Sequence, residues 1–372
     1  MKTRAAIIRK VSDKLEVVDI ELESPGQGEL QIKMVASGLC HTDEHMRTMP
    51  VLAHYPHVLG HEGAGIVESV GPNTPGWQVG DHVVFSFLPS CGRCRWCARG
   101  LSNLCDLGRY TVFGSRHDDP PTYRFNLDGE PVGQLAGLGT FSERTVVSVN
   151  SALKVDQDLP LESLSLLGCG VGTGWGSAVY AAEVLVGDIV IVMGTGGVGI
   201  NAVQGAAQAG AGEVVAVDPV EFKRNLATQF GATQIFSAMP EAEEFVKSVT
   251  NGQGADSAIV TVGVVKGEHI AQAIRAIRKG GTVVVTSMSD VDDNDGIPIN
   301  SRELTVMQKR LQGALFGQCN PRDDVPRQIE MYRRGQLKLD ELITRTYTLD
   351  QVNDALEDMN AGKNIRGVIR FD

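Results

Sequence analysis

The chain has 372 residues, of which 42% are apolar and 21% charged, and its formal net charge is −11 with a pI near 5.3. This length allows two domains that each bury a core, and the acidic balance opposes binding to phosphate backbones, so we expect no nucleic-acid partner. No apolar run reaches the length of a membrane span or of a signal-peptide core, and we expect a cytoplasmic protein without a membrane partner.

The first part of the chain, to about residue 165, is predicted to be rich in β-strands. Short β-branched runs bounded by Gly, Pro, Asn or Asp are typical of strands, and they cover residues 29–40, 63–71, 81–87 and 141–149. Between residues 108 and 140, Pro120, Pro121 and Gly129 indicate a loop or a hairpin.

Near residue 170 the pattern changes to strands that alternate with helices. The strand-like segments are 188–194, 213–218, 256–263 and 282–288, and the helical segments are 201–211, 221–232 and 269–281. This alternation predicts a parallel sheet covered by helices. It fades near residue 310, and the tail, 349–371, is predicted to form one helix and one closing strand.

The acidic segment 289–300 invites comparison with a calcium-binding loop. That pattern requires glycine and glutamate where the chain has Asp295 and Ser301. We therefore predict a solvated turn.

Four of the seven cysteines lie within fifteen residues, in the stretch CGRCRWCARGLSNLC, with the spacing C-x2-C-x2-C-x7-C. Four thiolates on a short loop close a tetrahedron around zinc, and such a site is structural. An iron–sulfur cluster of the ferredoxin type would need its fourth cysteine sooner and followed by proline. A reducing compartment disfavours disulfides. The spacing therefore predicts a structural zinc site made of Cys91, Cys94, Cys97 and Cys105.

A second metal site is suggested by Cys40, His61 and Cys169. Two cysteines and one histidine with long separations match a catalytic zinc that keeps one open position for water or substrate. Long separations are weak signals, and a lone cysteine in an apolar stretch is usually a small core residue. The spacing leaves both interpretations open. His54 and His57 also have ligand spacing, but we interpret them as solvated or packing residues.

The stretch GTGGVG, Gly194 to Gly199, follows an apolar strand and precedes a helix of small residues. Gly194 permits the tight turn, Gly196 lets the backbone approach a pyrophosphate, and Gly199 lets helix and strand pack closely. The helix N-terminus offers free N–H groups to the phosphates. Asp218 ends the next strand, where it would accept both ribose hydroxyls and repel a 2′-phosphate. The unit predicts a dinucleotide site that favours NAD over NADP.

Taken together, the motifs GLCHTDEH, GHEGAGIVESVG, GDHVV, CGRCRWCARGLSNLC, GCGVGTG and GTGGVG resemble those of the zinc-dependent medium-chain alcohol dehydrogenases, in order and over nearly the whole chain. The resemblance extends to the actinobacterial nicotinoprotein alcohol dehydrogenases, which keep NAD(H) bound between turnovers and are assayed with a nitrosoaniline dye. It implies a GroES-like β-rich catalytic domain over 1–170 and 315–372 and a Rossmann NAD-binding domain over 171–314. It also implies a homo-oligomer, either a dimer or a tetramer.

The resemblance assigns roles to individual residues. Cys40, His61 and Cys169 would hold a catalytic zinc, Asp43 would orient His61, and Glu62 could approach the metal. Thr42 and His45 match the proton relay. The residues that would contact the cofactor are His41, Gly194, Gly196, Gly197, Val198, Gly199, Asp218, Lys223 and Arg366.

The implied reaction is the reversible oxidation of an alcohol to an aldehyde or ketone. The zinc would acidify the substrate hydroxyl, its proton would leave by way of Thr42 and His45, and hydride would pass to NAD⁺. A thiol-dependent formaldehyde dehydrogenase is the alternative. Arg109 matches one cationic position of that branch, but Val51 replaces its acidic residue. An apolar pocket that involves Val51 and Phe87 is therefore expected, although Phe87 could equally belong to the core.

Overall fold

The structure is a computed structural model that describes residues 1–117, 119–290, 293 and 296–372. Four residues of the acidic segment, 291, 292, 294 and 295, lie outside this part, so the turn predicted there is not tested. The chain divides into two compact units. The first contains Met1–Cys169 and Asn320–Asp372, and the second Gly170–Cys319. None of the helices among the described residues has the length and apolar character needed to cross a lipid bilayer.

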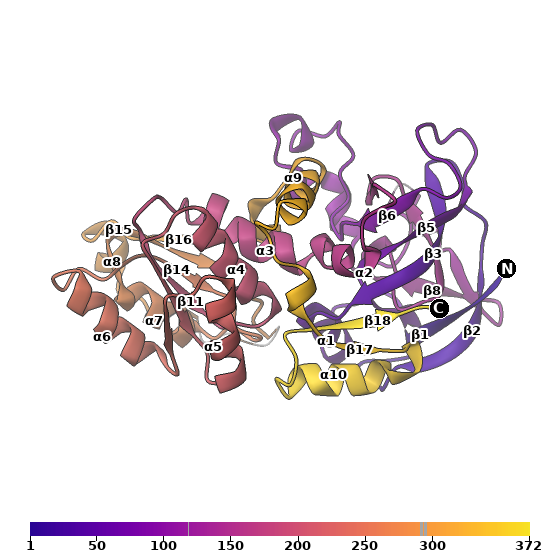
Figure 1. Cartoon of the computed structure of the whole chain (residues 1–372). Helices are drawn as coiled ribbons and strands as arrows, with labels where there is room; N and C mark the ends of the chain where they lie inside the picture. The colour runs from indigo at the N-terminus through magenta and orange to yellow at the C-terminus, as the bar shows by residue number, and fades with distance from the viewer. Residues whose placement is uncertain (118, 291–292, 294–295) are drawn as a thin grey trace. The chain divides into compact units, whose positions relative to one another are not determined.

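The first unit is built mainly from strands (Figure 1). In chain order they are β1 Lys2–Ile8, β2 Glu16–Leu22, β3 Glu29–Gly38, β4 His57–Val58, β5 Glu62–Val70, β6 His82–Phe85, β7 Phe125–Leu127, β8 Glu130–Gln134, β9 Arg144–Ser148, β10 Ala152–Val155, β17 Ile343–Tyr347 and β18 Arg366–Arg370. Its helices are α1 His41–Thr48, α2 Leu161–Leu164, α9 Pro321–Arg333 and α10 Val352–Asn360.

Two β-structures make up this unit. The strands β1, β2, β7, β8 and β4 close a barrel, and a second sheet has the order β10-β6-β5-β3-β18-β17, with β9 paired to β3. The predicted hairpin is confirmed, because β7 and β8 pair antiparallel around Asp128 and Gly129, which both have positive φ. The closing strand β18 pairs with β3, so the end of the chain completes the sheet that begins near residue 29.

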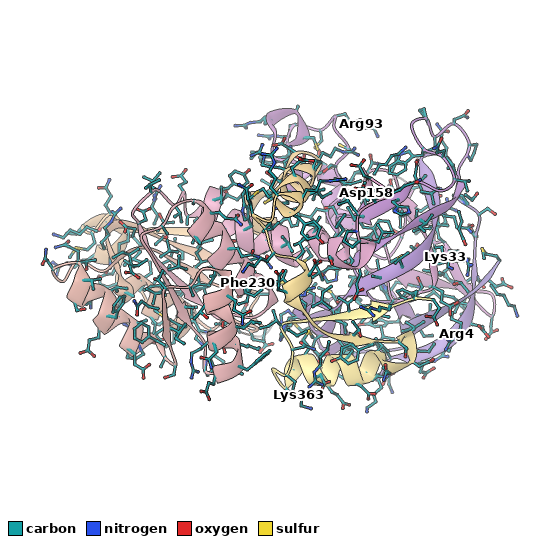
Figure 2. All side chains as sticks on the ribbon, viewed as in Figure 1. Arg4, Lys33, Arg93, Asp158, Phe230 and Lys363 are labelled. Atoms are coloured by element: carbon teal, nitrogen blue, oxygen red, sulfur yellow. The ribbon has the colours of Figure 1, made fainter. Side chains whose placement is uncertain are left out.

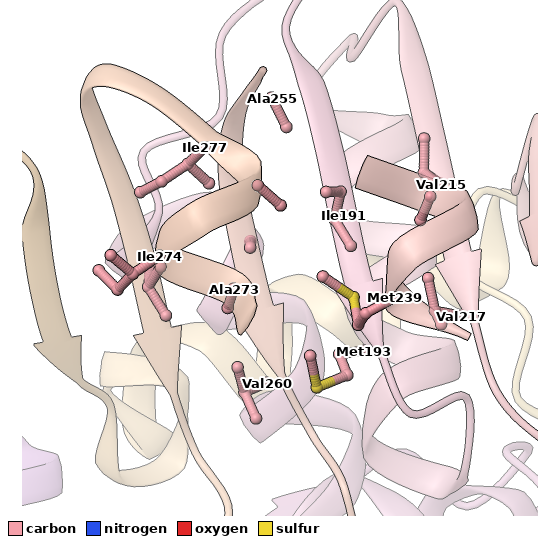
Figure 3. Packing of buried hydrophobic residues seen from close by; sticks show 14 of the residues in the cluster. Ile191, Met193, Val215, Val217, Met239, Ala255, Val260, Ala273, Ile274 and Ile277 are labelled. Atoms are coloured by element: carbon pink, nitrogen blue, oxygen red, sulfur yellow. The ribbon is translucent and has the colours of Figure 1, made fainter. Parts of the chain in front are cut away.

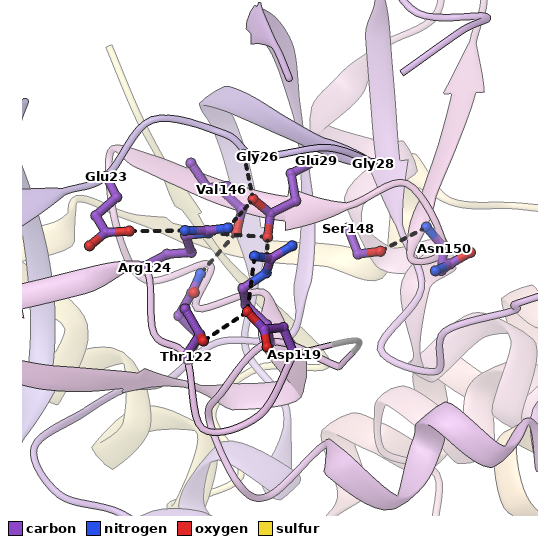
Figure 4. A network of polar contacts seen from close by, with 12 residues as sticks. Glu23, Gly26, Gly28, Glu29, Asp119, Thr122, Arg124, Val146, Ser148 and Asn150 are labelled. Atoms are coloured by element: carbon purple, nitrogen blue, oxygen red, sulfur yellow. Dashed lines mark hydrogen bonds and ion pairs between the residues drawn. The ribbon is translucent and has the colours of Figure 1, made fainter. Parts of the chain in front are cut away.

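A buried polar network ties the loop before β7 to this unit (Figure 4). The Glu29 carboxylate lies 2.6 Å from Nη2 of Arg124 and 2.7 Å from Nε of Arg116, and it accepts the N–H of Gly26 at 2.7 Å. Arg124 also donates to Glu23 at 2.9 Å. Since Glu29 and Arg124 are buried, each satisfies a charge that would be costly to leave alone.

The second unit is an open parallel sheet with helices. Its strands are β11 Ile189–Met193, β12 Glu213–Val217, β13 Gln234–Phe236, β14 Ala255–Val260, β15 Ile277–Val285 and β16 Arg310–Gly313. Its helices are α3 Gly170–Gly176, α4 Gly197–Gln208, α5 Glu221–Ala227, α6 Met239–Val249, α7 Gly267–Ala276 and α8 Ser301–Thr305. Among the described residues the strand order is β13-β12-β11-β14-β15-β16, and all neighbours are parallel. This is the doubly wound order of dinucleotide-binding domains.

One face of this sheet packs against α6 and α7 (Figure 3). Alternate strand residues such as Ile191, Met193 and Val215 meet Met239 from α6 and Ile274 from α7. The intervening residues of each strand point to the opposite face. Because both faces of the sheet are covered, residues on both sides of the inner strands are apolar, and these strands are nearly continuous apolar runs.

The predicted fold class, a GroES-like β-rich part with a Rossmann-type part, is confirmed, but two details of the pattern were wrong. The helical segment 269–281 ends as a helix at Ala276, and β15 begins at Ile277. The sheet continues past residue 310 into β16, whose residues are all exposed and therefore lack an apolar signature.

Exposed charged residues such as Arg93 and Asp158 project from the ribbon in Figure 2.

The second unit ends at Cys319, whereas the sequence placed the domain boundary at 314. Residues beyond 314 pack against α3, because the Phe316 ring lies over Gly172 and Cys319 Sγ donates to the Gly172 carbonyl at 3.3 Å. The role of each unit as a domain stays a prediction.

Candidate functional site

The first cluster of candidate residues gathers in the first unit, where β3 and a 3-10 turn, Ser165–Gly168, end and β5 begins. Cys40 follows β3 and precedes α1, His61 precedes β5, and Cys169 follows the 3-10 turn. Pairing of β3 with β5 puts Gly38 opposite Glu62 and so brings Cys40 close to His61. Potential ligand atoms of Cys40, His61, Glu62 and Cys169 all lie within 4.8 Å of one another.

The Asp43 side chain contacts two of the residues in this cluster, Cys40 and His61. It is fully buried, and its Oδ1 lies 2.9 Å from Nδ1 of His61 and accepts the N–H of Gly60 at 3.0 Å, while Oδ2 accepts the N–H of Cys40 at 3.1 Å. A proton on Nδ1 leaves Nε2 of His61 with its lone pair. Nε2 is itself buried.

The donor set fits a zinc ion. Two thiols and an imidazole nitrogen converge, and the imidazole is oriented by a carboxylate, as metal-ligating histidines usually are. The hydrogen bond between Cys40 and Cys169 lowers the pKa of the Cys40 thiol and raises the pKa of the Cys169 thiol. Without a metal, burial lowers the pKa of His61, the Asp43 carboxylate raises it, and the net pKa lies well above the usual value, so a zinc ion would displace a proton from Nε2.

The Glu62 carboxylate also forms an ion pair, with the buried Arg366 at the start of β18. Burial raises the pKa of Glu62 to about 7, with Arg366 opposing the rise. The two residues are far apart in the sequence. A Cβ on Gly38 would lie 2.3 Å from Oε2 of Glu62, so this pair requires a glycine at the end of β3.

The other residues predicted near this cluster lie on α1 and in the following loops. His41, Thr42 and His45 lie on α1, and His45 is buried. The Phe87 ring meets the His61 ring edge-on, with centroids 5.9 Å apart, and Phe87 also packs against the core around β6. Val51 packs against the cluster that contains Leu39 and Leu59.

The four-cysteine loop forms a second donor cluster. Sγ atoms of Cys91, Cys94, Cys97 and Cys105 all lie within 4.8 Å of one another, and Cys91 Sγ lies 4.0 Å from Cys97 Sγ. A zinc tetrahedron with Zn–S bonds of about 2.3 Å has edges of roughly 3.8 Å. Three backbone N–H groups donate to these sulfurs: that of Cys94 to Cys91 at 3.3 Å, that of Cys97 to Cys94 at 3.5 Å, and that of Cys91 to Cys105 at 3.4 Å. Such hydrogen bonds stabilise thiolates. The loop fits a zinc with no open position.

The glycine turn lies in the second unit, between β11 and α4. Gly194 has φ +93°, which favours glycine, and a Cβ on Gly199 would lie 1.8 Å from the Gly194 carbonyl oxygen. Gly196 is the N-cap of α4, and a Cβ there would meet no described atom within 4 Å. The turn therefore has open space at the helix N-terminus, as a bound phosphate requires.

Asp218, directly after β12, is buried and accepts the N–H of Thr195 at 2.8 Å and of Val220 at 2.9 Å. A carboxylate has about four lone-pair sites, so it retains capacity for ribose hydroxyls. Lys223 lies on α5. Sequence reasoning missed its neighbour Arg224, which donates to the carbonyls of Asp218 and Pro219 at 2.7 and 2.8 Å and stabilises the bend after β12.

Comparison with known proteins agrees with this geometry. The family described as "Alcohol dehydrogenase GroES-like domain" matches residues 26–157, and that described as "Zinc-binding dehydrogenase" matches 197–334. The chain is 47% identical to the NDMA-dependent alcohol dehydrogenase of Amycolatopsis methanolica, with 99% of each chain covered. It is 34% identical to the S-(hydroxymethyl)glutathione dehydrogenase of Paracoccus denitrificans, with 100% of each chain covered.

Among solved structures, benzyl alcohol dehydrogenase from Acinetobacter calcoaceticus has a TM-score of 0.91 at 28% identity, and 100% of each chain is covered. The descriptions of the two matched families and of the full-length relatives are consistent with two zinc donor clusters and a dinucleotide turn in this chain. The chain belongs to the zinc-dependent medium-chain alcohol dehydrogenase family.

Proposed function

We propose that this chain oxidises alcohols to aldehydes or ketones, and catalyses the reverse reaction, with NAD as the hydride carrier. The observation that carries the proposal is the convergence of Cys40, His61 and Cys169 with Asp43 behind the imidazole. A zinc ion at this site would lower the pKa of an alcohol hydroxyl, and NAD⁺ would accept the hydride. The glycine turn and Asp218 support the cofactor assignment.

The residues around the donor cluster have distinct proposed tasks. Asp43 keeps the proton of His61 on Nδ1 and so leaves Nε2 available. Thr42 and His45 are three residues apart on α1 and therefore lie on the same side of the helix, where they would pass the substrate proton outward. Phe87, beside His61, and Val51 would form an apolar substrate pocket.

Two groups of residues are assigned to the cofactor. Gly194, Gly196, Gly197, Val198 and Gly199 would approach the pyrophosphate, Asp218 and Lys223 the adenosine ribose, and His41 and Arg366 the phosphates. We assign the catalytic role to the first unit, predicted as 1–170 and 315–372, and NAD binding to the second unit, predicted as 171–314, with the boundaries moved to 169/170 and 319/320. The four-cysteine loop would hold the second, structural zinc.

We further propose that the nicotinamide stays bound between turnovers. Support comes from the 47% identity to an enzyme named NDMA-dependent alcohol dehydrogenase, because an enzyme that depends on an added acceptor need not release its nicotinamide. The alternative, a thiol-dependent formaldehyde dehydrogenase, has less support. Arg109 stacks on the Tyr110 ring at 4.5 Å, and the acidic residue of that branch is replaced by Val51.

A homo-oligomer, either a dimer or a tetramer, and a cytoplasmic location are part of the same proposal. β16 lies at the edge of its sheet with all its residues exposed, and an open strand edge favours pairing with another copy. Six of the seven cysteines are assigned to the two zinc sites, and thiol ligands of this kind suit a compartment that keeps cysteines reduced.

The test is to desalt the purified chain, measure its zinc and nicotinamide, and assay ethanol to benzyl alcohol with either free NAD⁺ or a nitrosoaniline dye. We expect two zinc ions and about one nicotinamide per chain, with turnover driven by the dye and independent of added thiol. Full activity in Cys40→Ser would overturn the proposed mechanism. Nicotinamide lost on desalting and activity restored by NAD⁺ would replace the retained cofactor with an exchanging one.

A further inference from the structure

The glycine turn after β11 is held from both neighbouring strands of the sheet. β12 and β14 flank β11, and each is followed directly by a side chain that contacts the turn. From the β12 side, Asp218 Oδ2 accepts the N–H of Thr195 at 2.8 Å. From the β14 side, the Thr261 hydroxyl donates to the carbonyl of Gly194 at 2.6 Å.

Thr261 is tied to the end of β11 by its backbone as well. Its N–H donates to the carbonyl of Met193 at 2.9 Å, and its hydroxyl lies 3.1 Å from the same oxygen. A hydroxyl has one proton, and the shorter contact, to Gly194, is the stronger hydrogen bond. The side chain therefore adds a second attachment at the residue where the turn begins.

The Gly194 carbonyl has little room to move. A Cβ on Gly199 would lie 1.8 Å from this oxygen and 2.7 Å from Oγ1 of Thr261, and a Cβ on Gly194 would lie 3.0 Å from the Thr261 carbonyl group. The turn, the first helical turn of α4 and the end of β14 therefore meet in van der Waals contact. A displaced Gly194 carbonyl would rotate the peptide groups that lead into α4.

We propose that Thr261 is a positioning residue for the dinucleotide turn. Its hydroxyl holds the Gly194 carbonyl, and this contact sets the direction of the N–H groups at the start of α4 that would bind the pyrophosphate. Such donors act only within narrow limits of distance and angle. The inference rests on the proposed function, because it needs a dinucleotide at this turn.

The test compares variants that separate the hydroxyl from the shape of the side chain. Thr261→Val keeps the shape and removes the hydroxyl, whereas Thr261→Ser keeps the hydroxyl and removes the methyl group. The matched control is Thr305→Val on α8, where an exposed threonine hydroxyl also donates to a backbone carbonyl, that of Ser301. The readouts are the rate at which NADH dissociates when chased with excess ADP-ribose, the zinc content, and the melting temperature of the nucleotide-free chain.

We expect NADH to dissociate about tenfold faster from Thr261→Val, as the loss of one partly buried hydrogen bond predicts. Thr261→Ser and Thr305→Val should stay near wild type, and the zinc content should not change. Equal dissociation rates in the valine variant and wild type would refute the inference, and so would an equal acceleration in the serine variant. If the valine variant does not fold, Thr261→Ala against Thr261→Ser gives the same comparison. A wild-type chain that binds no NADH would instead refute the proposed function, and this inference with it.

Discussion

Replacing Asp43 with asparagine tests how the proposed catalytic metal site is held. Asp43 is fully buried, and its two oxygens receive three contacts, from His61, Gly60 and Cys40. Asparagine has nearly the same shape but only one acceptor oxygen. In the variant, an amide N–H group must therefore face at least one of these three donors.

The size of the effect follows from these contacts. Leaving one buried N–H unsatisfied costs about 1–3 kcal/mol of folding free energy. Loss of the carboxylate that orients a ligating histidine lowers metal affinity by about 10-fold to 100-fold. We therefore expect Asp43→Asn to lose one of two zinc ions at a chelator concentration that the wild type withstands, while the four-cysteine loop keeps its own.

The assay is zinc per chain after dialysis against a series of chelator concentrations, together with unfolding in denaturant. Asp354→Asn is the control, because Asp354 is exposed on α10. If Asp43→Asn matched the control in both zinc retention and unfolding free energy, Asp43 would not orient the ligand and the proposed site would need another explanation.

Three other substitutions test separate parts of the structure. Cys97→Ser should remove the structural zinc and expose residues 91–105 to proteolysis, because this loop contributes little to the core without a metal; two zinc ions and a resistant loop would contradict this. Glu29→Ala should lower the unfolding free energy in denaturant by about 3–5 kcal/mol, since it leaves Arg124 buried without its main partner; a change as small as that of a surface substitution would count against the network. Burial lowers the pKa of the His57 ring to about 4 in the folded chain, against 6.5 in the unfolded chain. As the pH falls, the unfolded chain therefore binds the proton first, and about 3 kcal/mol of stability that is present above pH 6.5 is lost between pH 6.5 and 4. His57→Phe should therefore show a flatter dependence of unfolding free energy on pH over this range, and an unchanged slope would disprove the assignment.

The packing around His57 makes its substitution informative. A Cβ on Gly114 or Gly133 would lie 2.3 Å from its ring, so the ring fills a space closed by two glycines. Phenylalanine keeps a ring of similar size there, whereas a smaller residue would add the cost of a cavity. The comparison of slopes, rather than of absolute stabilities, separates titration from packing.

Local features of the amino-acid sequence were sufficient for the four-cysteine loop and the glycine turn. Both depend on residues close together in the chain, and short spacing restricts the geometry that a loop can adopt. The alternation of strands and helices also predicted the parallel sheet. It did not reveal β16, because all residues of this edge strand are exposed and carry no apolar pattern.

The catalytic cluster needed the tertiary structure. Cys40, His61 and Cys169 are brought together by the pairing of β3 with β5 and by the turn before Cys169, and no local pattern encodes that register. Spacing alone left this site undecided, and only the resemblance to a family favoured it. The pairing of Glu62 with Arg366 likewise depends on β18 returning to β3.

The amino-acid sequence by itself determined the sites whose residues are close together in the chain, namely the four-cysteine loop and the glycine turn. In such a site the residues share one loop or one helix end. Only the tertiary structure decided which distant side chains meet, such as Thr261 with Gly194 and Asp43 with His61. The physical reason is that strand register and packing are properties of the whole sheet, set by many contacts that act together.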